Sequence, residues 1–450
     1  MAFKGPYPTV FSGNTSAMVI SHTTFSGGVT NKGTIGPGGI SVISGAFLSG
    51  GGILDSGVVS GGIKVDSSSR IVTSGVQIDA IAVENVSTFG GGISNAGAIT
   101  AQRSAIRVLQ VSSFSGGIRN RGKIAGGVSG IDVDQVTNFV GGISNSGTIT
   151  ANIFGVAIEV FQNANFAGGI TNSGRLTAGT GIFFGTLGSS GLLFTPSTFS
   201  GGITDSGAIS ATKENGIDVA NAALVLGGIV NTGTISAIAH AILVSSVTEF
   251  AGGITNSGHI SGGGGSALAV TNVTTFSGGI LNAPSGVISG RNNGIYVNAT
   301  TFLGSIINAS GGKIVSATQN GIDVSKAVVF GNTNSASAII NRGTISAQAN
   351  GIEILNTTTF AGGVSNSGKI ASQLGRGILV SNVTVFGNSN PGGGVSNSGA
   401  ISAQASGIEI RNTATFGGSV VNSGTMSGHI RVSQVAAFGN QGSSANLSHY

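Results

Sequence analysis

The chain has no cysteine, no tryptophan and few charged residues. Of its 450 residues, only 7% are charged and only 6 are proline. The absence of cysteine excludes disulfide bonds and thiolate metal sites. No apolar run of about 18 residues occurs, so we expect no transmembrane helix, and the N-terminal segment lacks the pattern of a signal peptide. A net charge of +5 is too weak over this length to favour nucleic acid as a partner.

Glycine is abundant, and the sequence repeats itself. Gly occurs 81 times, and a hydrophobic fraction of 40% is too high for a disordered chain. The clearest marker of the repeat is Asn-x-Gly, with Asp replacing Asn at Asp55 and Asp205 and looser versions starting at Asn282 and Asn308. From Asn95 to Asn422 successive markers are 25 to 33 residues apart, most often 25 or 26. Such a unit with occasional additions predicts a solenoid with loop insertions.

Three short segments recur in each unit and predict β-strands. They are Phe-x-Gly-Gly-Ile, Gly-x-Ile-Ser/Thr-Ala and Gly-Ile-x-Val, each rich in β-branched residues and bounded by turn residues. Gly recurs too often for helices. Equivalent strands should therefore stack in register as an all-β, right-handed parallel β-helix, with three strands per coil and roughly fifteen coils. We expect this array to span residues 25–450, after an irregular lead-in or N-terminal cap at 1–24.

Two positions of the repeat are expected to hold successive coils together. The turn Asn should form a hydrogen-bonded ladder, with left-handed backbone at the Asn and positive φ at the following Gly. The ladder residues are Asn95, Asn120, Asn145, Asn172, Asn231, Asn256, Asn341, Asn366, Asn397 and Asn422. The Phe should point inward and stack on its equivalents, with Leu226 replacing it in one unit. This core stack comprises Phe89, Phe114, Phe139, Phe166, Phe199, Phe250, Phe276, Phe302, Phe330, Phe360, Phe386 and Phe416.

Longer units mark loop insertions. Extended segments follow Phe330, Phe386 and Phe438, and a further bulge is expected near residues 185–196. Long and short units alternate in the last third, so these loops should line up along one edge on alternate coils. The sequence ends just after His449, where the next turn Asn would fall. Because an uncapped coil leaves an exposed strand edge, we expect the sequence to be a piece of a longer array.

Charged residues at the middle of the Gly-Ile-x-Val strand are the candidates for chemistry. Alternation places them on the outside, between two inward apolar residues. Successive coils carry Arg107, Asp132 and Glu159, then Asp323 beside Glu353, and Glu409 beside Arg431. Carboxylates at about 5 Å could serve a retaining glycosidase or hold a weak Ca²⁺ ion. We favour a solvated ladder, partly offset by Arg107–Asp132 and Glu409–Arg431, and assign no catalytic, cofactor-binding or metal-binding residue.

Other polar residues give weaker signals. The histidines, His22, His240, His259, His429 and His449, show no metal-ligand spacing. The dense basic stretch contains Arg103, Arg107, Arg119, Arg121 and Lys123. We interpret it as solvated turn and face residues and not as a binding patch. Outward Ser and Thr side chains could accept glycans, but a soluble neutral surface explains them more simply.

The repeat resembles a known family in its style. The segments NSGTITA at 145, NSGKIA at 366 and NSGAISA at 397, alternating with GIxV and TFxGGI, are similar to autotransporter passenger domains. Those are surface-exposed β-helices of type V secretion in Gram-negative bacteria. The resemblance covers residues 25–450. It implies a cell-surface location and export through a C-terminal outer-membrane β-barrel, expected in the full-length protein.

These observations predict a non-enzymatic scaffold or adhesin that presents loops on a rigid stalk. Its partners would be glycans or proteins on a host or neighbouring cell, with no cofactor and no nucleic acid. A β-helical carbohydrate-active enzyme, of glycosidase or lyase type, is the first alternative. A passive spacer is the second.

Overall fold

The computed structural model describes residues 9–186, 197–332, 337–387, 393–438 and 447–449. In this part of the chain all regular elements are strands, and no helix that could cross a membrane is found. The chain is an all-β parallel solenoid of about 15 turns with roughly three strands per turn, so the predicted fold class is confirmed. It divides into two compact units, Met1–Gly227 and Gly228–Tyr450.

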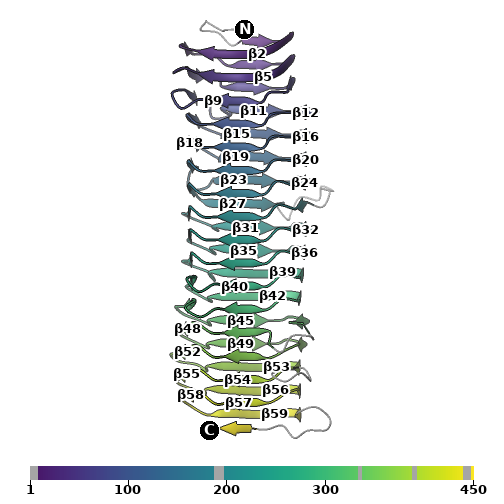
Figure 1. The fold of residues 1–450 in the computed structure, drawn as a ribbon, viewed down its shortest axis with the longest axis vertical. Helices are drawn as coiled ribbons and strands as arrows, with labels where there is room; N and C mark the ends of the chain where they lie inside the picture. Colours follow the sequence, from purple (N-terminus) through teal and green to yellow (C-terminus); the bar gives the residue numbers. More distant parts are fainter. Residues whose placement is uncertain (1–8, 187–196, 333–336, 388–392, 439–446, 450) are drawn as a thin grey trace. The chain divides into compact units, whose positions relative to one another are not determined.

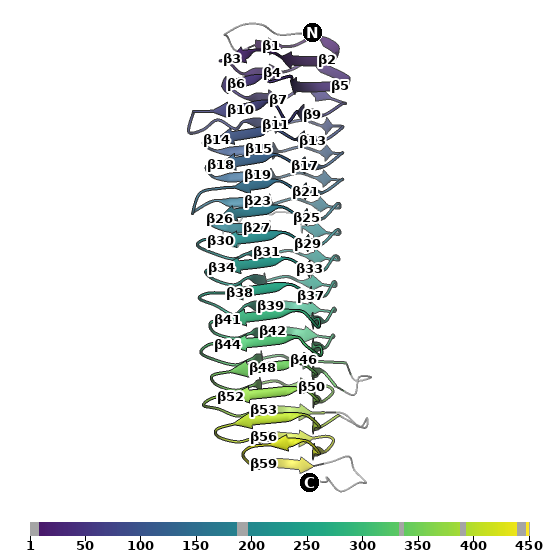
Figure 2. The ribbon, with the colours of Figure 1, turned by 60° about the vertical axis from the view of Figure 1, so that its left-hand side comes forward.

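One coil of the first unit illustrates how the repeat folds. It contains β19 (Ser129–Asp134), β20 (Asn138–Phe139), β21 (Ile143–Asn145) and β22 (Thr148–Thr150). Each strand pairs in parallel with its equivalents in adjacent coils, so that Ile143 is the register partner of Ile118 and of Ile170. Figures 1 and 2 show equivalent strands of this unit lying one above another. Identical residues are thereby stacked along the solenoid.

The Gly-Ile-x-Val strand positions the candidate chemistry. In the first unit it recurs as β11 (Ile81–Glu84), β15 (Ser104–Leu109), β19, β23 (Val156–Phe161), β27 (Thr180–Gly185) and β31 (Ile217–Ala220). In the second unit it recurs as β35 (Ile242–Ser245), β39 (Leu268–Phe276), β42 (Ile295–Phe302), β45 (Ile322–Ser325), β49 (Ile352–Leu355), β53 (Ile378–Phe386), β56 (Ile408–Phe416) and β59 (Ile430–Phe438). Some of these strands, such as β39, continue through the corner into the Phe segment, and their coils have three strands. Where the strand is interrupted there, as between β19 and β20, the coil has four.

Parallel pairing begins before the boundary set from the sequence. In the first unit β1 (Thr9–Phe11) pairs with β4 (Val29–Asn31), and β2 (Asn14–Ser21) pairs with β5 (Thr34–Ile43). Residues from Thr9 onward therefore already belong to the stack, whereas 1–8 lie outside the described residues.

In the first coils the strand that carries the Asn or Asp marker is aligned with a different strand of the repeat than in the later coils. Asp55 on β7 (Ile53–Asp55) aligns with Val83, whereas Asn95 aligns with Val65. Asn31 and Asp55 consequently form a separate short ladder, joined by a hydrogen bond of 2.7 Å.

Phenylalanine rings fill the core of both units. In the first unit Phe89, Phe114, Phe139 and Phe166 stack at centroid distances of 4.8–5.0 Å with nearly parallel planes. In the second unit the stack comprises Phe250, Phe276, Phe302, Phe330, Phe360, Phe386 and Phe416, at 4.6–5.1 Å. These rings are almost completely buried, and each contributes roughly 1.5–3 kcal/mol through burial alone.

The stack of the first unit has one irregularity. Phe199 meets Phe166 edge-on, at an interplanar angle of 74°, because the inward Phe184 of β27 stacks on Phe199 at 4.4 Å. The expectation that Leu226 replaces Phe in the next coil is wrong. Val225 is the register partner of Phe199 and is buried, whereas Leu226 is 49% exposed.

Asparagine side chains form the expected ladders inside each unit. In the first unit Nδ2 of one Asn donates to Oδ1 of the next along Asn95, Asn120, Asn145 and Asn172, and Asn172 donates to Asp205, at 2.6–2.8 Å. In the second unit the ladder runs through Asn231, Asn256, Asn282, Asn308, Asn341, Asn366, Asn397 and Asn422, at 2.6–2.9 Å. All of these side chains are buried, so each bond forms away from water.

The backbone explanation offered for this turn is wrong. Neither the ladder Asn residues nor the Gly of Asn-x-Gly have positive φ. A Cβ on Gly147 would instead lie 2.0 Å from the carbonyl oxygen of Gly122 in the preceding coil, so close backbone approach requires glycine. Positive φ occurs instead at the Gly-Gly corner, as at Gly141 and Gly142, and in residues other than glycine directly after the Gly-Ile-x-Val strand, as at Gln135 (φ 56°) and Asn356 (φ 51°).

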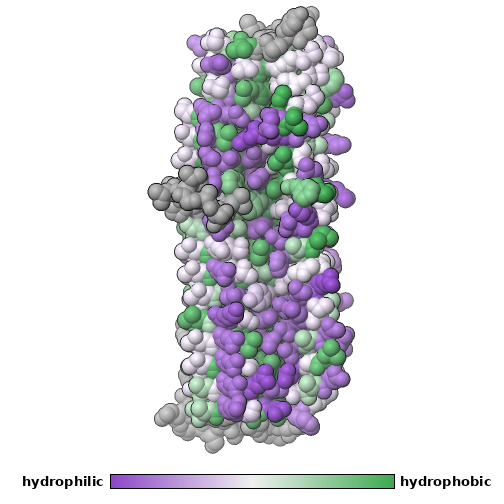
Figure 3. Space-filling model, turned by 180° about the vertical axis from the view of Figure 1, so that it is seen from behind, coloured by the Kyte–Doolittle hydropathy of each residue, from purple (hydrophilic) through white to green (hydrophobic). Residues whose placement is uncertain are grey.

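The predicted insertions lie largely outside the described residues. They fall on 187–196, 333–336, 388–392 and 439–446, so the expected alignment of loops along one edge has no described counterpart. Near the end of the chain, β60 (Leu447–His449) pairs with β57 (Val420–Asn422), which places His449 opposite Asn422. On the face seen in Figure 3, hydrophilic and near-neutral residues of each unit are interspersed with single hydrophobic ones.

Candidate functional site

The outward-facing charged residues of the first unit form one cluster. Register places Ala82, Arg107, Asp132 and Glu159 in a column across β11, β15, β19 and β23. Two residues further along the same strands, Glu84 and Asp134 face the same side. Asp79 and Arg103, which precede β11 and β15, complete the set. We call Asp79, Glu84, Arg103, Arg107, Asp132, Asp134 and Glu159 the charged cluster.

The expectation of a solvated ladder is wrong at the centre of this cluster. Arg107 is only 8% exposed and Asp132 only 9%. Adjacent coils bring outward side chains to the strand spacing of about 4.8 Å, so neighbours above and below shield them from water. An outward position on this sheet therefore does not ensure solvent contact.

Arg107 is shared among three carboxylates. Its Nε lies 3.6 Å from Asp132 Oδ2 and 3.9 Å from Glu84 Oε1, and Nη2 lies 3.8 Å from Asp134 Oδ2. These distances are longer than good hydrogen bonds. Among the described residues, Arg107 Nε and Asp134 Oδ1 are buried without a hydrogen-bond partner. The predicted Arg107–Asp132 pair is present, but the guanidinium group of Arg107 is also the counterion of Glu84 and Asp134.

The carboxyl groups of the cluster titrate abnormally. Burial and the Glu159 carboxylate raise the pKa of Asp132 to about 7, although Arg107 opposes them. Burial also raises the pKa of Asp134 to about 6, again against Arg107. Ser104 and Ser129 donate their hydroxyls to Asp132 and Glu159, at 3.4 and 2.7 Å. Near neutral pH, Asp132 can therefore hold or release a proton beside a second carboxylate.

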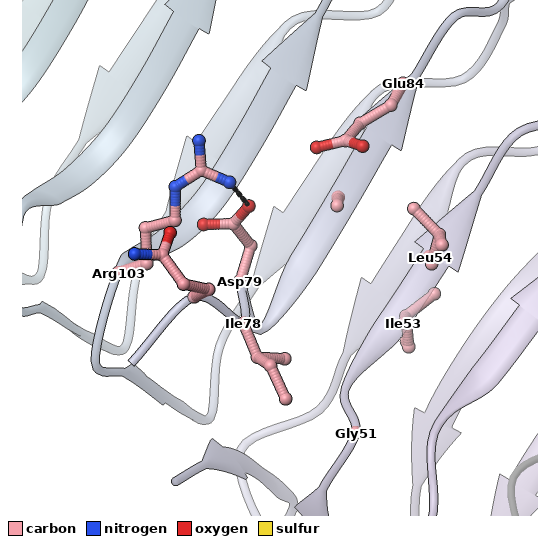
Figure 4. Close-up of a pocket in the computed structure, with 9 residues that line it drawn as sticks. Gly51, Ile53, Leu54, Ile78, Asp79, Glu84 and Arg103 are labelled. Atoms are coloured by element: carbon pink, nitrogen blue, oxygen red, sulfur yellow. Dashed lines mark hydrogen bonds and ion pairs between the residues drawn. The ribbon is translucent and has the colours of Figure 1, made fainter. Parts of the chain in front are cut away.

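A pocket of about 250 Å³ opens at one edge of the cluster. It is lined by Gly51, Ile53, Leu54, Gln77, Ile78, Asp79, Ala82, Glu84 and Arg103. The segment between β10 (Arg70–Thr73) and β11 spans residues 74–80, whereas the next coil has only 102–103 between β14 (Ala98–Ala101) and β15. Figure 4 shows the Asp79–Arg103 pair on one side of the pocket and Ile53 and Leu54 on the other. Glu84 extends from the neighbouring strand.

Sequence reasoning missed Asp79, Glu84 and Asp134. Two signals could have identified them. Glu84 and Asp134 stand two positions after the column residue, which puts them on the same face of the strand. Asp79 lies near the end of the lengthened segment 74–80 before β11, and this lengthening marks a departure from the repeat.

A second set of charged residues lies on the same strand type in the second unit. Asp323 and Glu353 are register partners on β45 and β49, and the Asn320 side-chain amide donates to both carboxylates. Burial raises the pKa of both groups, and Asp323 raises that of Glu353 further. Sequence reasoning missed Asn320, which stands immediately before a Gly-Ile strand.

Glu409 is paired differently from the sequence prediction. Arg431 is its register partner, but the ion pairs of Glu409 are with Arg376 Nε at 2.8 Å and Arg411 Nη1 at 3.6 Å. Burial opposes ionisation, but the hydrogen bond and charge of Arg376, together with Arg411 and Arg431, lower the pKa of Glu409 overall. This carboxylate is therefore a satisfied structural anion.

The remaining candidates do not converge. Within the described residues, no group of three or more His, Asp or Glu side chains is arranged to hold a metal ion. The basic stretch divides: Arg103 pairs with Asp79 and Arg107 joins the carboxylates, whereas Arg119, Arg121 and Lys123 are exposed near the next corners.

Comparisons with protein-family models, with curated protein sequences and with solved structures gave no match to this chain. The fold and the geometry of the charged cluster are therefore the basis for a functional proposal.

Proposed function

We propose that this chain is a non-enzymatic β-solenoid scaffold of adhesin type, which carries loops for contact with glycans or proteins at a cell surface. The observation behind the proposal is the buried Asn ladder, which repeats from coil to coil in each unit. The amide groups of the ladder join successive coils by hydrogen bonds, and the Phe rings join them by stacking and burying apolar surface. A chain organised in this way maintains a fixed spacing between surface segments.

The surface location rests on the repeat style shared with autotransporter passenger domains. A chain without cysteine also suits export in the unfolded state, because it forms no disulfide bonds on the way. The extended segments after Phe330 and Phe386 break the repeat and are therefore the proposed contact regions. The passive-spacer alternative keeps the same fold but assigns no partner to these segments.

A loop-replacement experiment tests the proposal. Residues 331–338 would be replaced by Ala-Gly-Gly, copying the short unit after Phe360, and the variant compared with wild type for binding to glycan arrays and to cultured cells. We expect binding to fall while circular dichroism and the thermal midpoint remain close to wild type. Binding by neither protein would instead support a passive spacer.

One observation favours an enzymatic alternative. Asp132, with its pKa raised to about 7, adjoins Glu159 on the next strand, and a proton donor beside a second carboxylate is what a retaining glycosidase uses. Asp132 is only 9% exposed, which restricts access for a polysaccharide. Assays on a polysaccharide panel, with Asp132→Asn and Glu159→Gln as controls, test this reaction. Turnover that both substitutions abolish would overturn the scaffold proposal.

A further inference from the structure

We propose that the pocket beside Asp79 and Glu84 binds an alkylammonium group, from either a free amine or a lysine side chain. The inference is independent of the scaffold role, since the pocket belongs to the first unit and uses neither of the proposed contact regions.

The shape of the pocket provides room for a short carbon chain. Residues 77–79, together with β7 and β11, line an open pocket of about 250 Å³. Leu54, Ile78 and Ala82 supply apolar surface, and Ile78 is 39% exposed at the rim. Figure 4 shows the Asp79 carboxylate across from Leu54, with the Glu84 carboxylate pointing toward Asp79 and Arg103. A small ligand with an apolar stem and a polar end matches this division.

Asp79 is already satisfied by protein groups. Its Oδ1 accepts a hydrogen bond from the Ser104 backbone N–H at 2.9 Å, and its Oδ2 accepts one from Arg103 Nη1 at 3.2 Å. Its side chain is 4% exposed, so it is a fixed wall of the pocket. Arg103 Nη1 is engaged by Asp79, and the Arg103 side chain, which is 32% exposed, lines the pocket beside it.

Glu84 has the most distant counterion of the three carboxylates around Arg107. Arg107 Nε lies 3.9 Å from Glu84, whereas the same guanidinium group approaches Asp132 to 3.6 Å through Nε and Asp134 to 3.8 Å through Nη2. Among the described residues, Glu84 receives no hydrogen bond, although its side chain is 24% exposed and faces the pocket. The charged cluster as a whole contains five carboxylates and two guanidinium groups. A ligand ammonium at Glu84 would add a positive charge where the one guanidinium of Arg107 is shared among three carboxylates.

The same groups argue against other ligands. The two carboxylates in the lining outnumber its one guanidinium, that of Arg103, and therefore disfavour an anion. A divalent metal ion needs more oxygen ligands than Glu84 and Asp79 offer, and no described group of three acidic or histidine side chains provides them. An alkylammonium has three N–H donors for carboxylate oxygens and a stem that covers Leu54 and Ile78.

Titration calorimetry on the full chain tests the proposal, with cadaverine as the probe and pentanol and valerate as neutral and anionic controls. We expect saturable binding of cadaverine alone. A blocked Lys-containing peptide and its acetyl-lysine form make up the second arm. Binding of cadaverine but not of the peptide identifies a free amine as the ligand, and binding of both extends the site to lysine side chains.

Three variants complete the test. Glu84→Gln should weaken cadaverine binding by about tenfold or more, because a charge-assisted hydrogen bond is lost. Glu249→Gln, at an exposed carboxylate in the second unit, should leave binding unchanged. Ile78→Lys, at the rim, should abolish binding by placing an ammonium group in the pocket from the protein itself. Equal binding of cadaverine and pentanol, or wild-type affinity in Glu84→Gln and Ile78→Lys, would overturn the proposal.

Discussion

Asn145 donates a hydrogen bond from Nδ2 to Asn172 Oδ1 at 2.7 Å, although the two residues are 27 positions apart in the chain. Its Oδ1 accepts from Asn120 Nδ2 at 2.8 Å, and its Nδ2 also reaches the carbonyl oxygen of Gly147 at 3.2 Å. One buried side chain thus joins three consecutive coils. Within a ladder, an amide such as that of Asn145 both accepts and donates, so its loss affects both of its neighbours.

Substitution of Asn145 by Ala should lower the free energy of unfolding by about 3 kcal/mol, because Asn120 Nδ2 and Asn172 Oδ1 each lose a buried partner worth about 1–3 kcal/mol. Guanidinium denaturation followed by circular dichroism measures the change. Ser144→Ala, on the same strand but facing outward, is the matched control and should stay within about 0.5 kcal/mol of wild type. Equal midpoints for the two variants would show that the ladder contributes nothing to stability.

This ladder could be predicted from the sequence because the same short turn recurs along the chain. When Asn-x-Gly returns about every 25 residues after the same type of strand, parallel strands pair in the register that stacks equivalent residues on each other. The Phe positions follow for the same reason. The offset of the first coils could not be predicted, since Asn31 fits the marker but sits on a strand that joins a different face.

The backbone at Gly147 and the burial of Asp132 were not predictable in this way. Both depend on how closely adjacent coils approach, which is a property of the stacked structure and not of one repeat. A glycine can be needed for positive φ or for lack of a Cβ, and the sequence alone does not distinguish these requirements. Likewise, outward alternation indicates direction but not exposure, which is set by side chains of the coils above and below.

Asp205 should make stability depend on pH. Burial raises its pKa to about 6 although Asn172 donates a hydrogen bond to it, whereas the unfolded chain has a value near 3.8. A raised carboxyl pKa contributes stability that is fully present below about pH 4 and is lost as pH rises through about 6. Asp205→Asn should therefore gain up to about 3 kcal/mol over wild type at pH 8 and little at pH 4. Denaturant midpoints at the two pH values measure this difference.

Asp66 provides a control of opposite sign for that experiment. Burial opposes ionisation of this carboxyl, but interactions with Ser69, Ser44 and Ser68 together outweigh burial and lower its pKa. Its contribution is present above the unfolded pKa and lost as pH falls, so Asp66→Asn should be destabilising at pH 8. A gain in both variants would indicate a general effect of removing negative charge.

Three glycine substitutions should separate space from backbone conformation. Gly147→Ala places a Cβ 2.0 Å from a carbonyl oxygen, and we expect the largest loss, above about 3 kcal/mol. Gly45 has φ of 73° but nothing within 4 Å of its Cβ, so Ala should cost only the left-handed strain, about 1–2 kcal/mol. Gly417 has neither restriction, and Ala there should be close to neutral. Thermal unfolding ranks the three variants by stability. A Gly45→Ala variant less stable than the Gly147→Ala variant would contradict the steric explanation.

Phe139 should be among the most sensitive core positions. Its ring lies 4.8 Å from those of Phe114 and Phe166 with interplanar angles of 4° and 10°, and it is completely buried. Phe139→Ala removes both stacking contacts and leaves a cavity between coils, which should cost about 3–5 kcal/mol. Phe154, which is 73% exposed with the Lys213 ammonium 4.2 Å from its ring centre, is the control. Phe154→Ala should cost no more than about 1 kcal/mol, the value of an exposed cation–π contact. Denaturation of the two variants under identical conditions measures both costs, and similar midpoints would mean that the stack is not a principal source of stability.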